Sequence, residues 1–141
     1  GIKDAIVSQK QTSFDGPMVT LVNKGTASAS EILAGSLQDN NRSILMGEQT
    51  YGKGLIQSLK SLGEDSGLAI TVASYLTPKG NNIQGRGMTP DKLLDIPEAS
   101  EYGSSDDKWV RNAELFLESL LENEDVPIQT NELSNEEIKK L

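Results

Sequence analysis

The sequence predicts an α/β fold, because short apolar strands and an amphipathic helix follow one another along the first part of the chain. Residues 17–22 are an apolar run that ends in the turn-forming tripeptide 23–25. A helical pattern comes next, and residues 43–46 then give a second apolar strand that Gly47 closes. The order strand, helix, strand, strand favours an α/β domain over an all-β one.

The predicted helix spans about residues 28–40. The helical period places four of its residues on one face: Ile32, Leu33, Ser36 and Leu37. Further along, residues 67–76 are the longest strand candidate, with both buried and alternating character. Residues 77–80 and 87–91 are predicted turns, and residues 92–96 a short edge strand.

The excess of acidic charge is confined to the end of the chain. Residues 1–97 hold nine acidic and nine basic side chains, whereas residues 98–141 hold twelve and four, which accounts for the net charge of −8. We therefore divide the chain into a region 1–97 and an acidic helical extension 98–141. An acidic chain without a basic stripe binds nucleic acid and anionic membranes poorly, so no nucleic-acid partner is expected.

Two helices are predicted in the acidic extension. Residues 104–107, Ser-Ser-Asp-Asp, are typical of a helix start, with the serine hydroxyl as cap and the acids near the positive end of the dipole. From about Lys108 an apolar stripe is expected to pack back on the core: Trp109, Ala113, Phe116, Leu117, Leu120 and Leu121. Residues 123–131 are a predicted linker, and Ser134 with Glu137 forms a capping box that begins a last short helix.

Cysteine and histidine are both absent from the 141 residues. The first absence excludes disulfides, thiol nucleophiles and thiolate metal sites, and the second excludes a Ser-His-Asp triad and imidazole-ligated zinc. We expect no metal and no cofactor, and any nitrogen base must be a lysine. No apolar run reaches the roughly 18 residues of a membrane span. Because the chain opens with Gly1 rather than Met, we interpret it as an excerpt from a longer polypeptide.

Ser28 is the candidate nucleophile. It lies in a run of small residues, 25–30, that follows a strand and opens a helix. The free N–H groups of a helix N-terminus stabilise developing negative charge. The N–H of Ala29 would therefore meet the oxyanion that forms when Ser28 attacks a carbonyl carbon.

Lys53 is the candidate general base, since a serine hydroxyl is a weak nucleophile until a nearby base takes its proton. A lysine acts as a base only when its amine is uncharged, and burial favours that form. Gly52 and Gly54 permit close backbone approach, and Gln57 is spaced to orient the amine. Three neighbours are placed to exclude water: Tyr51, Leu55 and Ile56.

Other interpretations of these residues stay open on spacing alone. Ser28 with Glu31 is also a capping box, and Lys53 between glycines is also typical of an exposed turn. Residues 47–53 fit the nucleotide-binding pattern G-x-x-x-x-G-K and precede apolar residues at near-helical spacing: Leu55, Ile56, Leu59 and Leu62. Gly54 stands where that pattern requires Ser or Thr to hold magnesium, which argues against a nucleotide site.

Several segments in order resemble the carboxyl-terminal processing (tail-specific) proteases. The likeness covers about residues 17–95 and is carried by these stretches: 22–35, with Gly25-Thr26-Ala27-Ser28-Ala29-Ser30-Glu31; 37–40; Thr50-Tyr51-Gly52-Lys53-Gly54-Leu55-Ile56-Gln57; 68–80; and 87–91. The resemblance implies Ser28 as nucleophile, Lys53 as base and Gln57 as the residue that orients the lysine. Glu31 and Asp39 match positions that assist in some members, whereas Ser30 is expected to be a helix first-turn residue.

The resemblance also implies a fold, partners and a location. The fold would be the C-terminal half of a crotonase-like protease core, with a mixed sheet and flanking helices. The substrates would be proteins or peptides with free C-terminal tails, the assembly would include a homo-oligomer, and the location would be extracytoplasmic (periplasm, cell envelope or secreted). Such proteases carry a PDZ domain and a glycine segment resembling the second oxyanion donor, neither of which is present. This excerpt alone is therefore expected to be inactive. Any membrane anchor is expected to lie in the missing N-terminal part. A non-catalytic scaffold or peptide-binding homologue is the alternative.

Overall fold

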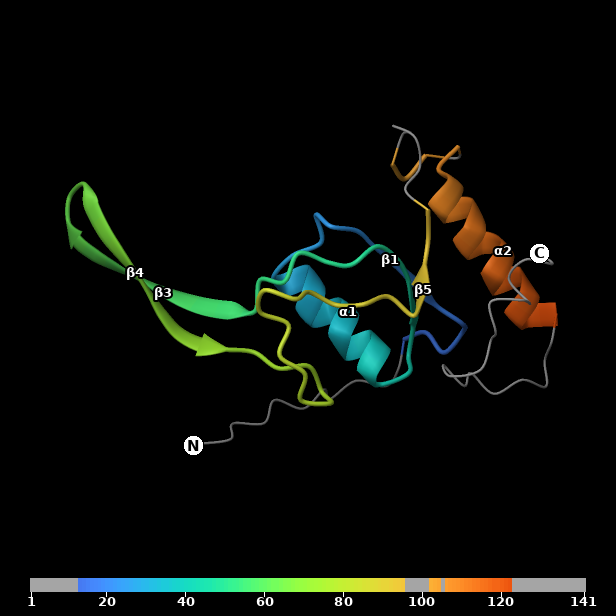
Figure 1. The fold of residues 1–141 in the computed structure, drawn as a ribbon, viewed down its shortest axis with the longest axis horizontal. Helices are drawn as coiled ribbons and strands as arrows, with labels where there is room; N and C mark the ends of the chain where they lie inside the picture. Colours follow the sequence, from blue (N-terminus) through green and yellow to red (C-terminus); the bar gives the residue numbers. More distant parts are fainter. Residues whose placement is uncertain (1–12, 96–101, 105, 123–141) are drawn as a thin grey trace.

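A small parallel sheet with one helix on each side forms the centre of the protein (Figure 1). The computed structural model describes residues 13–95, 102–104 and 106–122. The strand order is β1-β2-β5, and β2 runs parallel to both neighbours. The elements are β1 (Val19–Val22), α1 (Ala29–Asp39), β2 (Ile44–Gly47), β5 (Lys92–Leu93) and α2 (Lys108–Glu122). The α/β class predicted from the sequence is confirmed.

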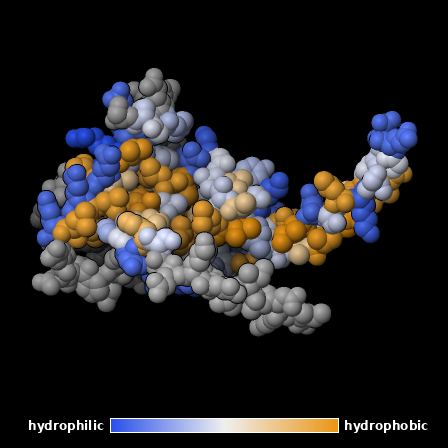
Figure 2. Space-filling model, turned by 180° about the vertical axis from the view of Figure 1, so that it is seen from behind, coloured by the Kyte–Doolittle hydropathy of each residue, from blue (hydrophilic) through white to orange (hydrophobic). Residues whose placement is uncertain are grey.

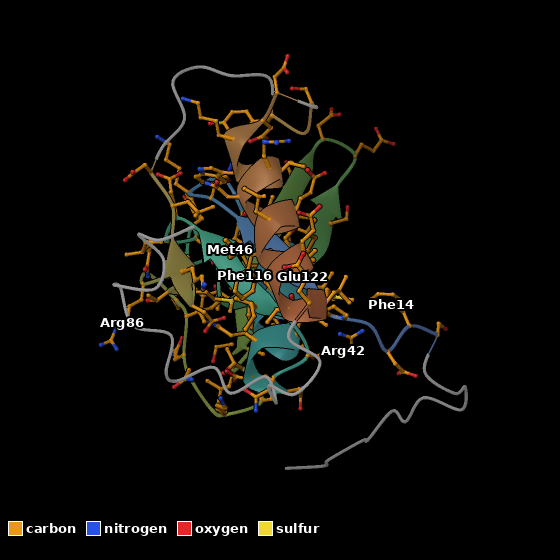
Figure 3. The ribbon with its side chains drawn as sticks, turned by 90° about the vertical axis from the view of Figure 1, so that its right-hand side faces the viewer. Phe14, Arg42, Met46, Arg86, Phe116 and Glu122 are labelled. Carbon is orange, nitrogen blue, oxygen red and sulfur yellow. The ribbon has the colours of Figure 1, made fainter. Side chains whose placement is uncertain are left out.

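The side chains of β2 alternate between two apolar clusters, one on each face of the sheet. Leu45 is fully buried toward α1, in a cluster with Val22, Ala34, Ile83 and Met88. Ile44 and Met46 point the other way and form a second cluster with Phe116 of α2. Figure 3 labels Met46 and Phe116 of this cluster. Because neighbouring residues of a strand face opposite sides, a four-residue strand serves both clusters.

Helix α1 turns its small residues toward the sheet. Ala34 and Gly35 are buried, whereas Ile32 and Leu33 are exposed. Gly35 allows this close approach, because an added Cβ would lie 3.2 Å from the Met88 side chain. The predicted bounds of the helix are confirmed. Of the four residues predicted to share one face, Ile32, Leu33 and Ser36 are exposed, and only Leu37 is half-buried.

Helix α2 packs on the core as predicted, except that Leu121, expected in the packed stripe, keeps 60% of its surface exposed. Trp109 and Phe116 are buried, and the Trp109 indole N–H donates to the Asp95 carbonyl oxygen over 2.8 Å. The predicted cap is wrong in its residue. The carboxylate of Asp107, rather than a serine hydroxyl, accepts the Trp109 backbone N–H over 2.9 Å, as expected for a residue that precedes the first turn. The linker 123–131 and the helix from Ser134 lie outside the described residues.

A long antiparallel hairpin, β3 (Leu55–Gly63) with β4 (Ser66–Ser74), extends away from the sheet (Figure 1). The helical spacing noted after Lys53 is therefore misleading, since Leu55 to Leu62 belong to a strand. The buried character expected for residues 67–76 is also wrong, because all of β4 is exposed. Figure 2 shows the apolar side chains that this projecting hairpin leaves uncovered.

The two predicted turns have different outcomes. Residues 77–80 form a turn in which the Gly80 N–H donates to the Thr77 carbonyl oxygen over 2.8 Å. Residues 87–91 do not form the turn expected there. The chain turns just before them, at residues 84–86, where the N–H of Gly87 donates to the Ile83 carbonyl oxygen. The predicted edge strand is present as β5 but contains only two residues.

Candidate active site

Ser28 occupies the junction between the turn after β1 and the first residue of α1. Its φ is 57° and its ψ is −119°, a left-handed conformation that non-glycine residues rarely adopt. Strain of this kind persists only where the surrounding structure enforces it, and it is common at functional sites. The Ser28 carbonyl oxygen accepts the first helical bond, from the Ile32 N–H at 3.0 Å. The half-buried serine therefore stands at a helix N-terminus, as predicted.

The carboxylate of Glu31 joins the Ser28 segment to the Lys53 segment. Glu31 is completely buried, and its Oε2 accepts the backbone N–H of Ser28 and that of Lys53, each over 2.9 Å. Its Oε1 accepts the Thr50 hydroxyl and the Gly52 N–H, the latter over 2.7 Å. The capping contact predicted between Ser28 and Glu31 is therefore present, and it also brings the candidate base loop to the nucleophile.

These bonds determine the charge state of Glu31. Burial by itself raises the pKa of the carboxyl group. The Thr50 hydroxyl and the N–H groups of Lys53, Gly52 and Ser28 act in the opposite sense and hold the pKa below its ordinary value of 4.5. Glu31 is thus a buried anion with four donors, an arrangement that offsets the cost of removing a charge from water.

The loop that carries Lys53 is held by close backbone contacts. Gly52 has a φ of 89°, and an added Cβ would lie 2.6 Å from the Gly87 nitrogen. The N–H of Gly54 donates to the Gln84 side-chain oxygen over 2.8 Å. The glycines flanking Lys53 therefore have the role predicted for them, which is to let neighbouring backbones approach.

The side chains of the candidate base region line an open hollow of about 570 Å³. Lys53, Gln57 and Tyr51 are among its lining residues. Lys53 is exposed, and the neighbours expected to shield it leave it open, since Tyr51 keeps 67% of its surface accessible. Within the described parts of the chain, no hydrogen bond joins the Lys53 amine to the Ser28 hydroxyl or to Gln57. Backbone contacts bring the two segments together, but the side chains of Ser28 and Lys53 are not hydrogen-bonded to each other.

Ala29 is the first residue of α1, at the helix end where N–H groups have no intrahelical acceptor. Its N–H is therefore available in the position predicted for an oxyanion donor. Ser30, the next residue, is exposed in the first turn, as expected. Asp39 lies at the far end of α1, about 16 Å from Ser28 at 1.5 Å per residue, and its carboxylate accepts the Lys79 N–H. Asp39 is thus not part of this cluster.

Tyr75 is a site residue that the sequence analysis did not single out. Its hydroxyl lies 2.7 Å from the Lys53 carbonyl oxygen and 3.2 Å from the Ser28 carbonyl oxygen. Burial, and then the negative charge of Glu31, raise the pKa of the Tyr75 phenol. No spacing rule signals this residue, because it meets Ser28 and Lys53 only through the folding back of the hairpin.

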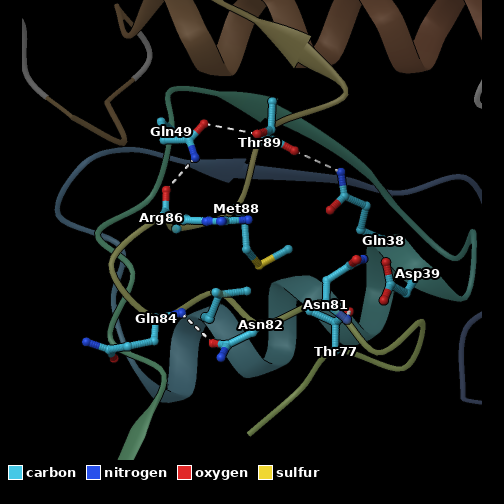
Figure 4. A pocket seen from close by; sticks show the side chains of 12 residues that line it. Gln38, Asp39, Gln49, Thr77, Asn81, Asn82, Gln84, Arg86, Met88 and Thr89 are labelled. Atoms are coloured by element: carbon cyan, nitrogen blue, oxygen red, sulfur yellow. Dashed lines mark hydrogen bonds between the residues drawn. The ribbon is translucent and has the colours of Figure 1, made fainter. Parts of the chain in front are cut away.

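A second hollow, of about 670 Å³, is lined in part by residues of the 82–89 segment and is rich in amide side chains (Figure 4). Its amides mainly tie loops together. The Gln38 side-chain nitrogen donates to the Thr89 carbonyl oxygen over 3.1 Å, and that of Gln49 donates to the Arg86 carbonyl oxygen. These contacts hold the segment that in turn supports Gly52.

Three further observations concern nucleotide, metal and membrane binding. Residues 47–53 lead into strand β3, so the loop-to-helix arrangement of a phosphate-binding P-loop is not formed there. Among the described residues, no group of three or more acidic side chains is arranged to hold a metal ion. None of the helices in the same residues is long and apolar enough to cross a membrane.

Residues 2–94 match the model of Peptidase family S41. The chain belongs to this family. It is 50% identical over 97 residues to a carboxyl-terminal-processing protease of Synechocystis, a match that covers 69% of this chain and 23% of that protein. It is 53% identical over 97 residues to the chloroplastic C-terminal processing peptidase of Tetradesmus obliquus, covering 67% and 21%. The S41 chain thus spans less than a quarter of the length of these relatives.

Solved structures agree with this S41 assignment. The photosystem II D1 C-terminal processing protease superposes with a TM-score of 0.53 at 56% identity, over 56% of this chain and 20% of that one. Mature CPAF superposes with a TM-score of 0.56 over 82% of this chain and 22% of its own, but at 19% identity, which is a likeness of fold alone.

Proposed function

We propose that this chain is part of a C-terminal processing peptidase in which Ser28 and Lys53 form a Ser/Lys dyad. The observation that carries the proposal is the shared oxygen of Glu31, which accepts the backbone N–H of both residues. A nucleophile on a strained helix N-terminus and a lysine anchored to the same carboxylate are the parts that such a dyad requires. Membership of family S41 supports a peptidase over other uses of the pair.

The reaction would proceed through an acyl-enzyme. Ser28 Oγ attacks the scissile carbonyl carbon while the uncharged Lys53 amine takes its proton. The N–H of Ala29 stabilises the oxyanion, and the resulting lysine ammonium returns the proton to the leaving amine. Water, activated by the same lysine, then releases the acyl group from Ser28. Gln57, which lines the hollow with Lys53, would orient the amine.

We infer that the 141-residue chain by itself does not cleave peptides. Lys53 is exposed, whereas a lysine base needs a setting that excludes water to keep its amine uncharged. Ala29 supplies one oxyanion donor, and the second would come from the remainder of the protein. The longer relatives, of which this chain spans less than a quarter, have the length to supply that shielding.

The remaining assignments follow from the same proposal. Residues 1–97 would be the C-terminal half of a crotonase-like catalytic domain and residues 98–141 an extension that docks on it through α2. The partners would be proteins with free C-terminal tails, and an N-terminal PDZ domain would belong to the intact chain. An extracytoplasmic location is supported by relatives that are bacterial or chloroplastic by name.

The test uses the full-length protein and a substrate with an unstructured C-terminal tail. Ser28→Ala and Lys53→Met should each abolish cleavage, with losses of 10³-fold or more, since removing either member of such a unit disables it. Ser30→Ala is the matched control: it removes a hydroxyl two residues away and should leave the rate unchanged. Full activity in Lys53→Met would reject the dyad.

The exposure of Lys53 keeps one alternative open, a peptide-binding homologue that does not catalyse. A fluorophosphonate probe distinguishes the two, because it labels only an activated serine. Labelling of the full-length protein that disappears in Ser28→Ala supports the peptidase. Tail binding without any labelling supports the binding module.

A further inference from the structure

Tyr75 lies where the main chains of Ser28 and Lys53 meet. It directly follows β4 at the base of the hairpin, and its ring packs against the apolar cluster on the α1 side of the sheet. Its hydroxyl is within hydrogen-bond distance of two carbonyl oxygens, that of Lys53 at 2.7 Å and that of Ser28 at 3.2 Å. A phenol has one proton to donate, so this proton is shared, with the shorter contact to Lys53.

Glu31 holds the same two residues from their N–H side. One of its oxygens, Oε2, accepts both backbone N–H groups over 2.9 Å. The backbone N–H groups of Ser28 and Lys53 therefore both donate to the Glu31 carboxylate, and their carbonyl oxygens both accept from the Tyr75 hydroxyl. This arrangement fixes the two main chains relative to each other, although no side-chain bond joins them in the described part of the protein.

We propose that Tyr75 is a positioning residue for the reaction of Ser28 and Lys53. Its hydroxyl, acting opposite the Glu31 carboxylate, sets the separation of the two main chains from which nucleophile and base project. The inference rests on the proposed function, because it assigns Tyr75 a role in that same site. It does not make Tyr75 a catalytic residue, since the hydroxyl contacts backbone carbonyl oxygens rather than the reacting atoms.

The position of Tyr75 explains why such a bond is needed. Lys53 is only two residues before β3, and the hairpin that begins there is exposed along almost its whole length. The Tyr75 N–H also donates to the Gly54 carbonyl oxygen over 3.1 Å, so Tyr75 ties together both strands at the base of the hairpin. Without these bonds, any displacement of the hairpin would also displace Lys53. The Tyr75 phenol, whose pKa is raised from its ordinary value of 10.0 by burial and then by the charge of Glu31, is protonated and able to donate at neutral pH.

The test is Tyr75→Phe in the full-length protein, which removes the hydroxyl and keeps the packed ring. We expect kcat for tail cleavage to fall about 10- to 100-fold with KM unchanged, because misplacement of a catalytic group by about 1 Å costs a factor of that size. Tyr102→Phe is the matched control: the same hydroxyl is removed from an exposed tyrosine, and kcat should stay at the wild-type value. Replacing Tyr75 with 4-aminophenylalanine, whose amine restores a donor, should recover most of the loss.

Two comparisons separate positioning from mere stability. Ile44→Val loosens the apolar cluster on the α2 side of the sheet, away from Tyr75, and it should lower the melting temperature while leaving kcat unchanged. Rates are expressed per reactive Ser28, counted with a fluorophosphonate probe, so that misfolded molecules are not included. If kcat of Tyr75→Phe stays within twofold of wild type while Ser28→Ala is dead, the positioning role is wrong and the dyad stands. Undiminished cleavage by Ser28→Ala would overturn both.

Discussion

The Thr50 hydroxyl donates to the Glu31 carboxylate and at the same time accepts the Met88 backbone N–H over 2.7 Å. This one side chain links the buried carboxylate of Glu31 to the 82–89 segment, which contains Met88. The site therefore depends on the charge of Glu31 as much as on the residues that would perform the chemistry.

Glu31→Gln is expected to destabilise the fold by about 2–4 kcal/mol. An amide keeps one acceptor oxygen but turns an NH2 group toward donors, which leaves about two buried N–H groups unsatisfied at about 1–3 kcal/mol each. The free energy of unfolding in urea measures this loss. Glu64→Gln, the same change in the exposed hairpin loop, should alter stability by less than about 0.5 kcal/mol. Equal stabilities for the two variants would contradict the role of Glu31 as a buried anion.

Acid should weaken the protein through Glu31. Its folded pKa lies below the ordinary 4.5, so the unfolded chain binds the proton more readily. The stabilisation is fully present above the unfolded value and disappears as pH falls through the folded one. The free energy of unfolding should therefore decline below about pH 4.5 in wild type, and less steeply in Glu31→Gln. Asp107, whose pKa is lowered by bonds from the Gly103 and Trp109 N–H groups, leaves a residual slope in the variant.

Two glycines with nearly the same positive φ should respond differently to alanine. Gly85 has a φ of 72° with open space around it, so Gly85→Ala should cost about 1–2 kcal/mol from conformation alone. Gly87 has a φ of 70°, but an added Cβ would lie 2.1 Å from the Thr50 carbonyl oxygen. Gly87→Ala should therefore cost about 3–5 kcal/mol, the overpacking adding to the conformational term.

The same pair tests whether the 82–89 segment supports the active site. In the full-length protein, Gly87→Ala should lower the cleavage rate because it displaces Thr50 and with it Glu31, whereas Gly85→Ala should not. Thermal unfolding and tail cleavage, measured side by side, decide the matter. Similar losses of stability in both variants would mean that the 82–89 segment shifts to accommodate the added Cβ, and that its packing against the Thr50 carbonyl oxygen is not tight.

Local patterns predicted those parts of the fold that local physics controls. The βαβ order, the start of α1 at Ser28 and most of the apolar stripe of α2 follow from periodicity and capping, and they are present. The second strand of the hairpin was predicted as the strand candidate 67–76. The first strand was missed because Leu55, Ile56, Leu59 and Leu62 recur at near-helical spacing, and nothing local shows that they lie in an exposed strand. Because the hairpin is exposed, the expectation that β4 is partly buried was also wrong.

The sequence could nominate residues for the candidate site but not the connections between them. Ser28 and Lys53 follow from composition, turn chemistry and resemblance, and the structure brings their backbones together. The double role of Glu31 could have been suspected from the capping box, which places a carboxylate at the right turn of the helix. The contact of Tyr75 with two carbonyl oxygens depends on residues 22 and 47 positions away, which no short pattern encodes.

The docking of α2 decides whether the described part of the acidic extension belongs to the same folding unit as the sheet. Phe116 is 7% exposed and packs against Met46 and Ile44. The Lys92 amine nitrogen lies over its ring, 3.9 Å from the ring centroid. Phe116→Ala should therefore cost about 3–5 kcal/mol, the usual penalty for removing a buried aromatic ring. Leu121→Ala, on the same helix but 60% exposed, should cost less than about 0.5 kcal/mol.

Both values come from urea unfolding followed separately by Trp109 fluorescence and by circular dichroism. Coincident transitions shifted by Phe116→Ala place α2 in one cooperative unit with the sheet. A fluorescence transition that moves alone would make it a separate, weakly docked helix.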